Sequence, residues 1–153
     1  MHNNEYFMKE ALKEAKKAYT KEEIPIGAII VKDGKILSRA YNKREEKMIS
    51  TAHSEILAIE KACKKLENWR LSDCEIYVTV EPCPMCAGAI LNSRMKKLYF
   101  GTRDEKSGAV VSNIHMLDKE YLNHKMNYEE GMLKDECRDL LVDFFKKRRK
   151  NIF

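Results

Sequence analysis

Hydrophobic residues recur along the chain with two different spacings, and these spacings predict an alternation of helices and strands. Helical spacing covers three long segments, at residues 4–20, 51–66 and 132–150. A fourth helix is expected to start at Pro84, which suits a first helical turn, and to run to Leu91. Short segments rich in β-branched or aromatic residues predict strands at residues 26–31, 36–42, 74–80, 97–100 and 125–128.

The order of these elements predicts an α/β fold. Asp33-Gly34 supplies the positive-φ pair of a hairpin turn between the first two strands. The third and fourth strands enclose one helix with short connections, so they should be parallel. Residues 102–117 are expected to form a long loop, and residues 118–123 a helical turn. The fold class that follows is a three-layer α/β/α fold, with helices on both faces of a mixed sheet of about five strands.

Length and composition favour one compact unit. The 153 residues contain no repeat, linker or low-complexity segment, which predicts a single domain over residues 1–153. Hydrophobic residues make up 44% and charged residues 35%, as in soluble globular proteins and unlike disordered ones. No apolar segment approaches the roughly 20 residues that cross a bilayer. The charged N-terminus lacks a signal-peptide core, so we expect a cytoplasmic protein without a membrane partner.

The net charge of +5 is concentrated at one end of the chain. Residues 146–150 contain five cations and no acid, so they equal the whole excess. This basic end of the helix predicted over residues 132–150 suits an anionic partner. Cations are also favourable at the C-terminus of any helix. Charge alone therefore leaves both interpretations open.

Two short motifs, each at the start of a predicted helix, carry the candidate chemistry. Cys83 and Cys86 are spaced so that both thiols point the same way from a first turn. Thr51 is the expected N-cap of the helix that carries His53 and Glu55 in its first turn. Helices packed alongside one sheet present their N-termini at the same edge, so His53 can become the third ligand of one ion. Three protein ligands leave a fourth tetrahedral position for water, which is typical of catalytic zinc. The odd number of cysteines, five, also favours reduced thiols.

Glu55 is not needed as a ligand, and this suggests another role for it. Its carboxylate can reach a zinc-bound water and move protons. H-x-E followed by P-C-x-x-C matches the zinc deaminase signature. A redox cysteine pair would leave the His-x-Glu pair unexplained, and a closed structural zinc site would lack a convincing fourth ligand.

Along almost its whole length the chain resembles the bacterial tRNA-specific adenosine deaminases of the cytidine deaminase superfamily. The similar segments include EIPIGAIIV, YNKRE, TAHSEILAI, NWRL, YVTVEPCPMCAGAI, FGTRDEKSGA and LLVDFFKKRR. The metal motif defines only the superfamily, whereas GTRD and FFKKRR favour an enzyme of tRNA. The resemblance implies hydrolytic deamination of adenosine to inosine at the wobble position. It implies one zinc ion per subunit on His53, Cys83 and Cys86, with Glu55 as the proton shuttle.

The resemblance also implies contacts with the anticodon stem-loop of a tRNA. Asn42 is expected to hydrogen-bond the target base, although without the resemblance it could be a turn residue that caps the second strand. Contacts with the RNA backbone are expected at Asp104, Lys106 and Asn123. Phe145 is expected to pack near a splayed nucleotide, although its spacing alone favours core packing, and Arg148 and Arg149 should meet phosphates. The family is homodimeric, so two subunits are expected to share the tRNA.

Two departures from the family pattern and two other functions stay open. Ser54 stands where the family usually has alanine, and its side chain is expected to point away from the metal. Residues 110–116 are less like the family's loop of small residues. A guanine or cytidine deaminase would share the zinc chemistry without the basic tail. A non-catalytic, zinc-stabilised RNA-binding module would not need Glu55.

Overall fold

The computed structural model describes residues 2–118 and 122–151. Its five strands form one sheet in the order β2-β1-β3-β4-β5. β1 pairs antiparallel with β2 and β3, whereas β3, β4 and β5 are parallel. The parallel pairing expected for the third and fourth strands is thus confirmed. The strands are β1 (Gly27–Lys32), β2 (Lys35–Tyr41), β3 (Cys74–Val80), β4 (Lys97–Thr102) and β5 (Asn127–Glu130).

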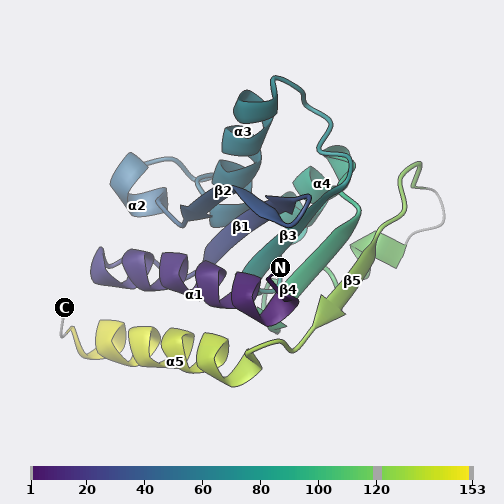
Figure 1. Ribbon diagram of the computed structural model, residues 1–153. Helices are drawn as coiled ribbons and strands as arrows, with labels where there is room; N and C mark the ends of the chain where they lie inside the picture. The colour runs from purple at the N-terminus through teal and green to yellow at the C-terminus, as the bar shows by residue number, and fades with distance from the viewer. Residues whose placement is uncertain (1, 119–121, 152–153) are drawn as a thin grey trace.

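Helices cover both faces of this sheet, which confirms the three-layer α/β/α arrangement. Figure 1 shows α1 and α5 side by side on one face, with α3 and α4 on the other. A short helix, α2, and a single 3-10 turn, η1, lie in the connections. The helical elements are α1 (Asn4–Thr20), α2 (Arg44–Lys47), α3 (Ser54–Leu66), α4 (Pro84–Asn92), η1 (Met116–Asp118) and α5 (Lys134–Lys150).

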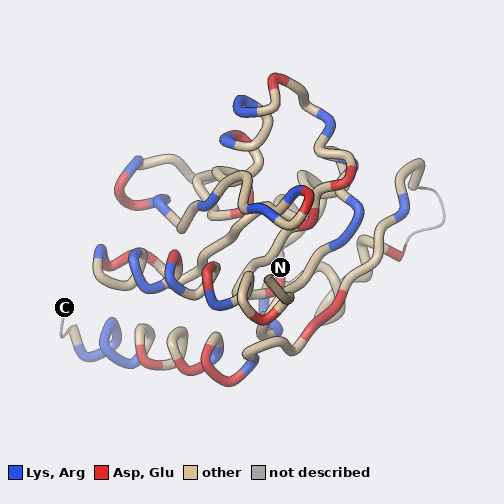
Figure 2. Tube along the Cα trace, viewed as in Figure 1, with Lys and Arg blue, Asp and Glu red and all other residues tan. Residues whose placement is uncertain are grey.

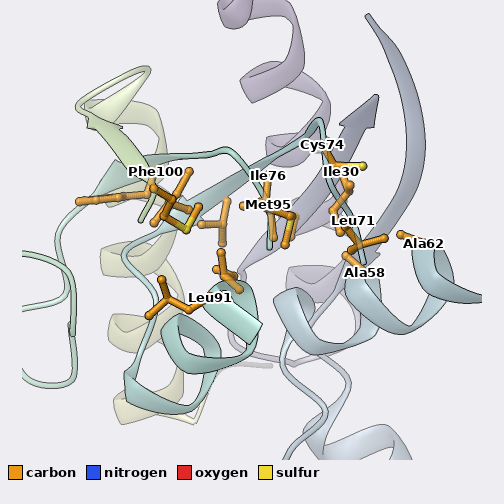
Figure 3. Close-up of a cluster of buried hydrophobic side chains, with 14 of the residues drawn as sticks. Ile30, Ala58, Ala62, Leu71, Cys74, Ile76, Leu91, Met95 and Phe100 are labelled. Atoms are coloured by element: carbon orange, nitrogen blue, oxygen red, sulfur yellow. The ribbon is translucent and has the colours of Figure 1, made fainter. Parts of the chain in front are cut away.

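The pleat of the central strands explains why two hydrophobic clusters form. Successive side chains of a strand point to opposite faces of the sheet. In β3, Ile76 and Val78 therefore contact the α3 and α4 layer, whereas Tyr77 contacts the α1 and α5 layer. Figure 3 shows part of the first cluster, in which Ile76 and Phe100 of the sheet belong to one group with Leu91 and Ala58 of the helical layer. Strands apolar on both sides are expected in the middle of such a sheet.

Two local predictions differ from the structure. Residues 43–50, for which the sequence predicts neither a helix nor a strand, contain α2, because the buried Glu23 carboxylate accepts hydrogen bonds from the Glu45 and Glu46 N–H groups at its start. Thr51 is not the N-cap of α3; His53 is. The first N–H of that helix, on Ser54, is instead bonded by a side chain from the end of β2, which local sequence does not indicate. The helical turn expected over 118–123 falls partly on residues 119–121, outside the described residues.

The two edges of the sheet at which the parallel strands begin and end differ in character. The N-termini of α3 and α4 meet at the edge where these strands end. At the opposite edge, just after α3, lies Trp69, the one tryptophan of the sequence, which is 55% exposed. The guanidinium groups of Arg70 and Arg94 lie 4.8 and 5.9 Å from its ring centre. Among the described residues, no helix is both long and apolar enough to cross a membrane.

Candidate active site

The three predicted ligands lie at the N-termini of two helices. His53 is the N-cap of α3 and Cys83 the N-cap of α4, both with extended backbone. The sequence predicts both residues inside the first turn, whereas the structure places each of them just before it. Cys86 follows in the first turn of α4 and is fully buried. Pro84 occupies the first helical position, where a missing N–H costs no hydrogen bond.

The positions of these side chains fit a tetrahedral metal ion. One ligand atom from each residue lies within 4.8 Å of the other two. His53 Nδ1 is 3.8 Å from Cys83 Sγ and 3.6 Å from Cys86 Sγ. A zinc ion binds sulfur at about 2.3 Å and nitrogen at about 2.0–2.1 Å. At a tetrahedral angle these bonds place the nitrogen and the sulfur about 3.6 Å apart. The donor set and its spacing therefore match those of a zinc site.

The charges of the two cysteines point to the same conclusion. A hydrogen bond from Cys86 lowers the pKa of the Cys83 thiol to about 4, against the effect of burial. The hydrogen bond to Cys83, together with burial, raises the pKa of Cys86. The Cys83 thiolate also raises the pKa of the His53 imidazole. Two thiolates this close repel each other, so a divalent cation between them would let both ionise.

Glu55 lies beside this group and is 4% exposed. Burial raises the pKa of its carboxyl, which favours a group that can both take up and release a proton. Ser54 is fully buried, and its hydroxyl donates to Glu55 Oε1 at 2.8 Å. The expectation that the Ser54 side chain points away from the metal stays a prediction, whereas its contact with Glu55 is observed. Its side chain turns back to the carboxylate of the next residue.

Asn42 joins the site from the end of β2. Its Oδ1 accepts the Ser54 N–H at 2.7 Å, so it holds the start of α3. In the described part of the chain its Nδ2 has no hydrogen-bond partner, which leaves a donor for a ligand. Asn42 also lines a small pocket, and Arg148 from the end of α5 lines the same pocket. The structure thus brings together two predicted site residues that are more than a hundred positions apart.

The other predicted contacts are not gathered around the metal ligands. Asp104 is half-buried, and its Oδ1 accepts the N–H groups of Lys106 and Ser107, which makes a tight turn. Lys106, Asn123 and Arg149 are exposed. Phe145 is 37% exposed while its neighbour Phe144 is buried in the core. Of the two phenylalanines it is therefore Phe145 that can meet a ligand.

Sequence reasoning assigned no role to two buried acids near the site. Glu23 holds α2, which follows Asn42, and Glu81 lies between β3 and Cys83. Each of these two acids lies one or two residues before a proline in a segment that resembles the family. Their hydrogen-bond partners, however, are about twenty or more residues away in the sequence. For Glu81 the available signal is an acid in an otherwise apolar stretch, since acids are rarely buried without a partner. Glu23 directly follows Lys21 and Glu22, so it carries no such signal.

Comparison with known proteins agrees with this site. The MafB19-like deaminase family matches residues 1–149. The tRNA-specific adenosine deaminase of Bacillus subtilis is 48% identical over 98% of this chain and 93% of its own length. That of Aquifex aeolicus is 51% identical over 97% of both chains. A solved structure from a study of A-to-I editing by tRNA:A34 deaminases is 40% identical, with a TM-score of 0.86 over 89% of this chain and 99% of that one. The chain therefore belongs to the MafB19-like deaminase family and, within it, to the tRNA-specific adenosine deaminases.

Proposed function

We propose that this protein hydrolytically deaminates adenosine to inosine at the wobble position of a tRNA anticodon. The observation that carries the chemistry is the buried Glu55 carboxylate beside a His-Cys-Cys group with the spacing of a tetrahedral ion. The choice of RNA as substrate is supported by the relatives and by the cations of residues 146–150, of which Arg148 lines the pocket of Asn42.

The side chains of the site divide the chemistry among them. A zinc ion on His53, Cys83 and Cys86 would supply the Lewis acid that makes water nucleophilic near neutral pH. Glu55 takes the proton from the attacking water and passes protons to the adenine ring and to the amino group, which leaves as ammonia. Asn42 donates its free N–H to the base and so orients C6 toward the water. A wobble base in a single-stranded loop costs little to extrude toward these side chains.

The wider assembly extends this proposal. We infer one zinc ion per subunit of a cytoplasmic homodimer, with the anticodon stem-loop shared between its subunits. A single deaminase domain over residues 1–153 would then end in the basic helix. Met48 and Ile49, 90% and 50% exposed beside the site, support an apolar contact with a second copy. The RNA backbone would meet Asp104, Lys106 and Asn123 on one side, and Phe145, Arg148 and Arg149 on the other.

Inosine mapping tests the substrate directly. The protein is incubated with total tRNA, with free guanine and with cytidine, and inosine and released ammonia are measured. Inosine confined to wobble positions supports the proposal. Turnover of a free base with unchanged tRNA would instead assign a small-molecule deaminase, and binding of tRNA without any ammonia would assign a non-catalytic module.

Replacing Glu55 tests the proton shuttle. Glu55→Gln keeps the shape of the side chain but cannot take a proton, so kcat on tRNA should fall roughly 10²–10⁴-fold. Elemental analysis should still give one zinc per chain, because Glu55 is not a ligand. Glu67→Gln, at the far end of α3, is the matched control and should keep full activity. An active Glu55→Gln enzyme would refute the assigned role.

A further inference from the structure

Glu81 is a buried acid that the proposed deamination does not use. It is 3% exposed and lies between the end of β3 and the first metal-ligating cysteine. Its N–H donates to the carbonyl of Thr102 on the neighbouring strand β4. A buried carboxylate is costly unless hydrogen bonds replace its lost water, so its partners should indicate its role.

All five hydrogen bonds to the Glu81 carboxylate come from one loop. Oε2 accepts the N–H groups of Val110, Val111 and Ser112 at 3.0, 2.8 and 2.9 Å. Oε1 accepts the Asp104 N–H at 3.1 Å and the Ser112 hydroxyl. We name residues 104–112 the carboxylate-bound loop. Both ends of this loop are therefore bonded to one carboxylate.

The carboxylate-bound loop is built to approach Glu81 closely. A Cβ atom at Gly108 would overlap the carboxylate carbon and both of its oxygens, so glycine is required at this point. The Ala109 N–H donates to the carbonyl of Pro82 at 2.9 Å, which ties the loop to the residue just before Cys83. The loop therefore lies directly against the start of α4, where the metal ligands are.

The same loop carries two of the predicted RNA contacts. The Asp104 N–H is held by Glu81, and Asp104 Oδ1 in turn accepts the Lys106 N–H at 3.1 Å. Fixing the backbone of Asp104 thus fixes the direction in which Lys106 leaves the loop. We propose that Glu81 is a positioning residue, which holds the carboxylate-bound loop in the conformation that receives the RNA. This inference rests on the proposed function, and Glu81 itself touches neither the substrate nor the metal.

A double-mutant cycle tests this role. Glu81→Gln replaces an acceptor oxygen with an amide that donates, so at least one set of backbone N–H groups loses its partner. KM for a short anticodon stem-loop RNA should rise about tenfold or more, with kcat within about threefold and zinc content unchanged. Lys106→Ala should raise KM less. The double variant should resemble Glu81→Gln alone, because a displaced loop has already lost the Lys106 contact.

Hydrogen exchange gives a readout that needs no enzymatic activity. The amides of Val110, Val111 and Ser112 should lose protection in Glu81→Gln and keep it in Glu105→Gln, a change of an exposed acid in the same loop. This result separates the two proposals: an inactive wild type refutes the RNA function, while unchanged protection in Glu81→Gln refutes the role of Glu81.

Other outcomes also decide the question. The proposal would be overturned if Glu81→Gln lost kcat or zinc at unchanged KM. It would also be overturned if the effects of Glu81→Gln and Lys106→Ala on KM multiplied in the double variant. If Glu81→Gln does not fold, Ser112→Ala replaces it in the cycle, since it removes one donor and leaves the carboxylate in place. Ser112→Ala should then raise KM by a smaller factor, and adding Lys106→Ala should not multiply the two effects. An unchanged KM in Ser112→Ala would overturn the inference.

Discussion

At the scale of single residues, the site depends on how Ser54 connects its two neighbours in space. Its N–H is held by Asn42 and its hydroxyl holds Glu55. One side chain that would bind the base and one that would move protons are thus joined through a single serine. A hydrogen bond to a carboxylate favours its charged form, and the Ser54 hydroxyl accordingly lowers the pKa of Glu55 against the larger, opposite effect of burial.

Ser54→Ala should therefore change the pH dependence of the reaction. Without the hydroxyl the pKa of Glu55 rises further, so less of the base form is present at low pH. The acid limb of kcat/KM should therefore move to higher pH, while the rate well above that limb should change little. Ser93→Ala, at the end of α4, is the control and should leave the profile in place. A shift to lower pH would contradict the assigned hydrogen bond.

The sequence predicts the chemical groups of the site better than their connections. The spacing of His53, Glu55, Cys83 and Cys86 indicates a zinc deaminase because few other sites need those residue types together. The turn of Ser54 toward Glu55 depends on a rotamer, which spacing does not describe. Glu81 finds its partners 23 to 31 residues further on, in a loop without any periodic pattern. An acid in an apolar stretch can indicate that Glu81 needs partners, but nothing in the local sequence indicates which residues they are.

At the scale of elements, the helices and strands of the core were predictable, and the connections less so. α1 has the predicted bounds, because its apolar face repeats with helical spacing over 17 residues. The final helix starts at Lys134 and not at residue 132, since element ends carry weak signals. α2 exists because Glu23 caps it from another part of the chain. The hairpin turn at Asp33-Gly34 has the expected positive φ angles.

The packing of α1 against β1 allows a test of stability. A Cβ atom at Gly27 would overlap the Ala11 carbonyl oxygen and the Ala15 nitrogen, both backbone atoms of α1. Gly27→Ala should therefore push the helix away and lower the free energy of unfolding by about 3 kcal/mol or more. Gly34→Ala has open space but a φ of +74°, so about 1 kcal/mol is expected. Urea denaturation measures both, and equal losses would contradict this packing.

At the scale of the whole molecule, charge is separated along α5. Its first turns carry acids and its last turn carries Lys147, Arg148, Arg149 and Lys150, as Figure 2 shows at the end marked C. Both Arg148 and Arg149 are exposed, and Arg148 also donates to the carbonyl of Glu22 and packs on Phe144. The helix end therefore offers a group of exposed cations, of which Arg148 lines the pocket of Asn42.

Salt dependence of RNA binding should reveal this basic end. Arg149→Ala removes one phosphate contact, so the slope of log K against log salt for the anticodon stem-loop should fall by about 0.7–0.9. The affinity should drop uniformly for stem-loops of different sequence. Lys64→Ala, an exposed cation in the last turn of α3, is the control and should leave the slope unchanged. Equal slopes for all three proteins would exclude Arg149 from the RNA contact.

The place of Trp69 has a practical consequence for such measurements. α3 has 13 residues, so at 1.5 Å per residue it is about 20 Å long, with His53 before its first residue and Trp69 after its last. As the sole indole of the chain, it dominates the intrinsic fluorescence from a region remote from the deamination chemistry. An emission change during an RNA titration would therefore signal contact with the region around Trp69, whereas silent binding would mean that the nucleic acid does not reach this end of α3.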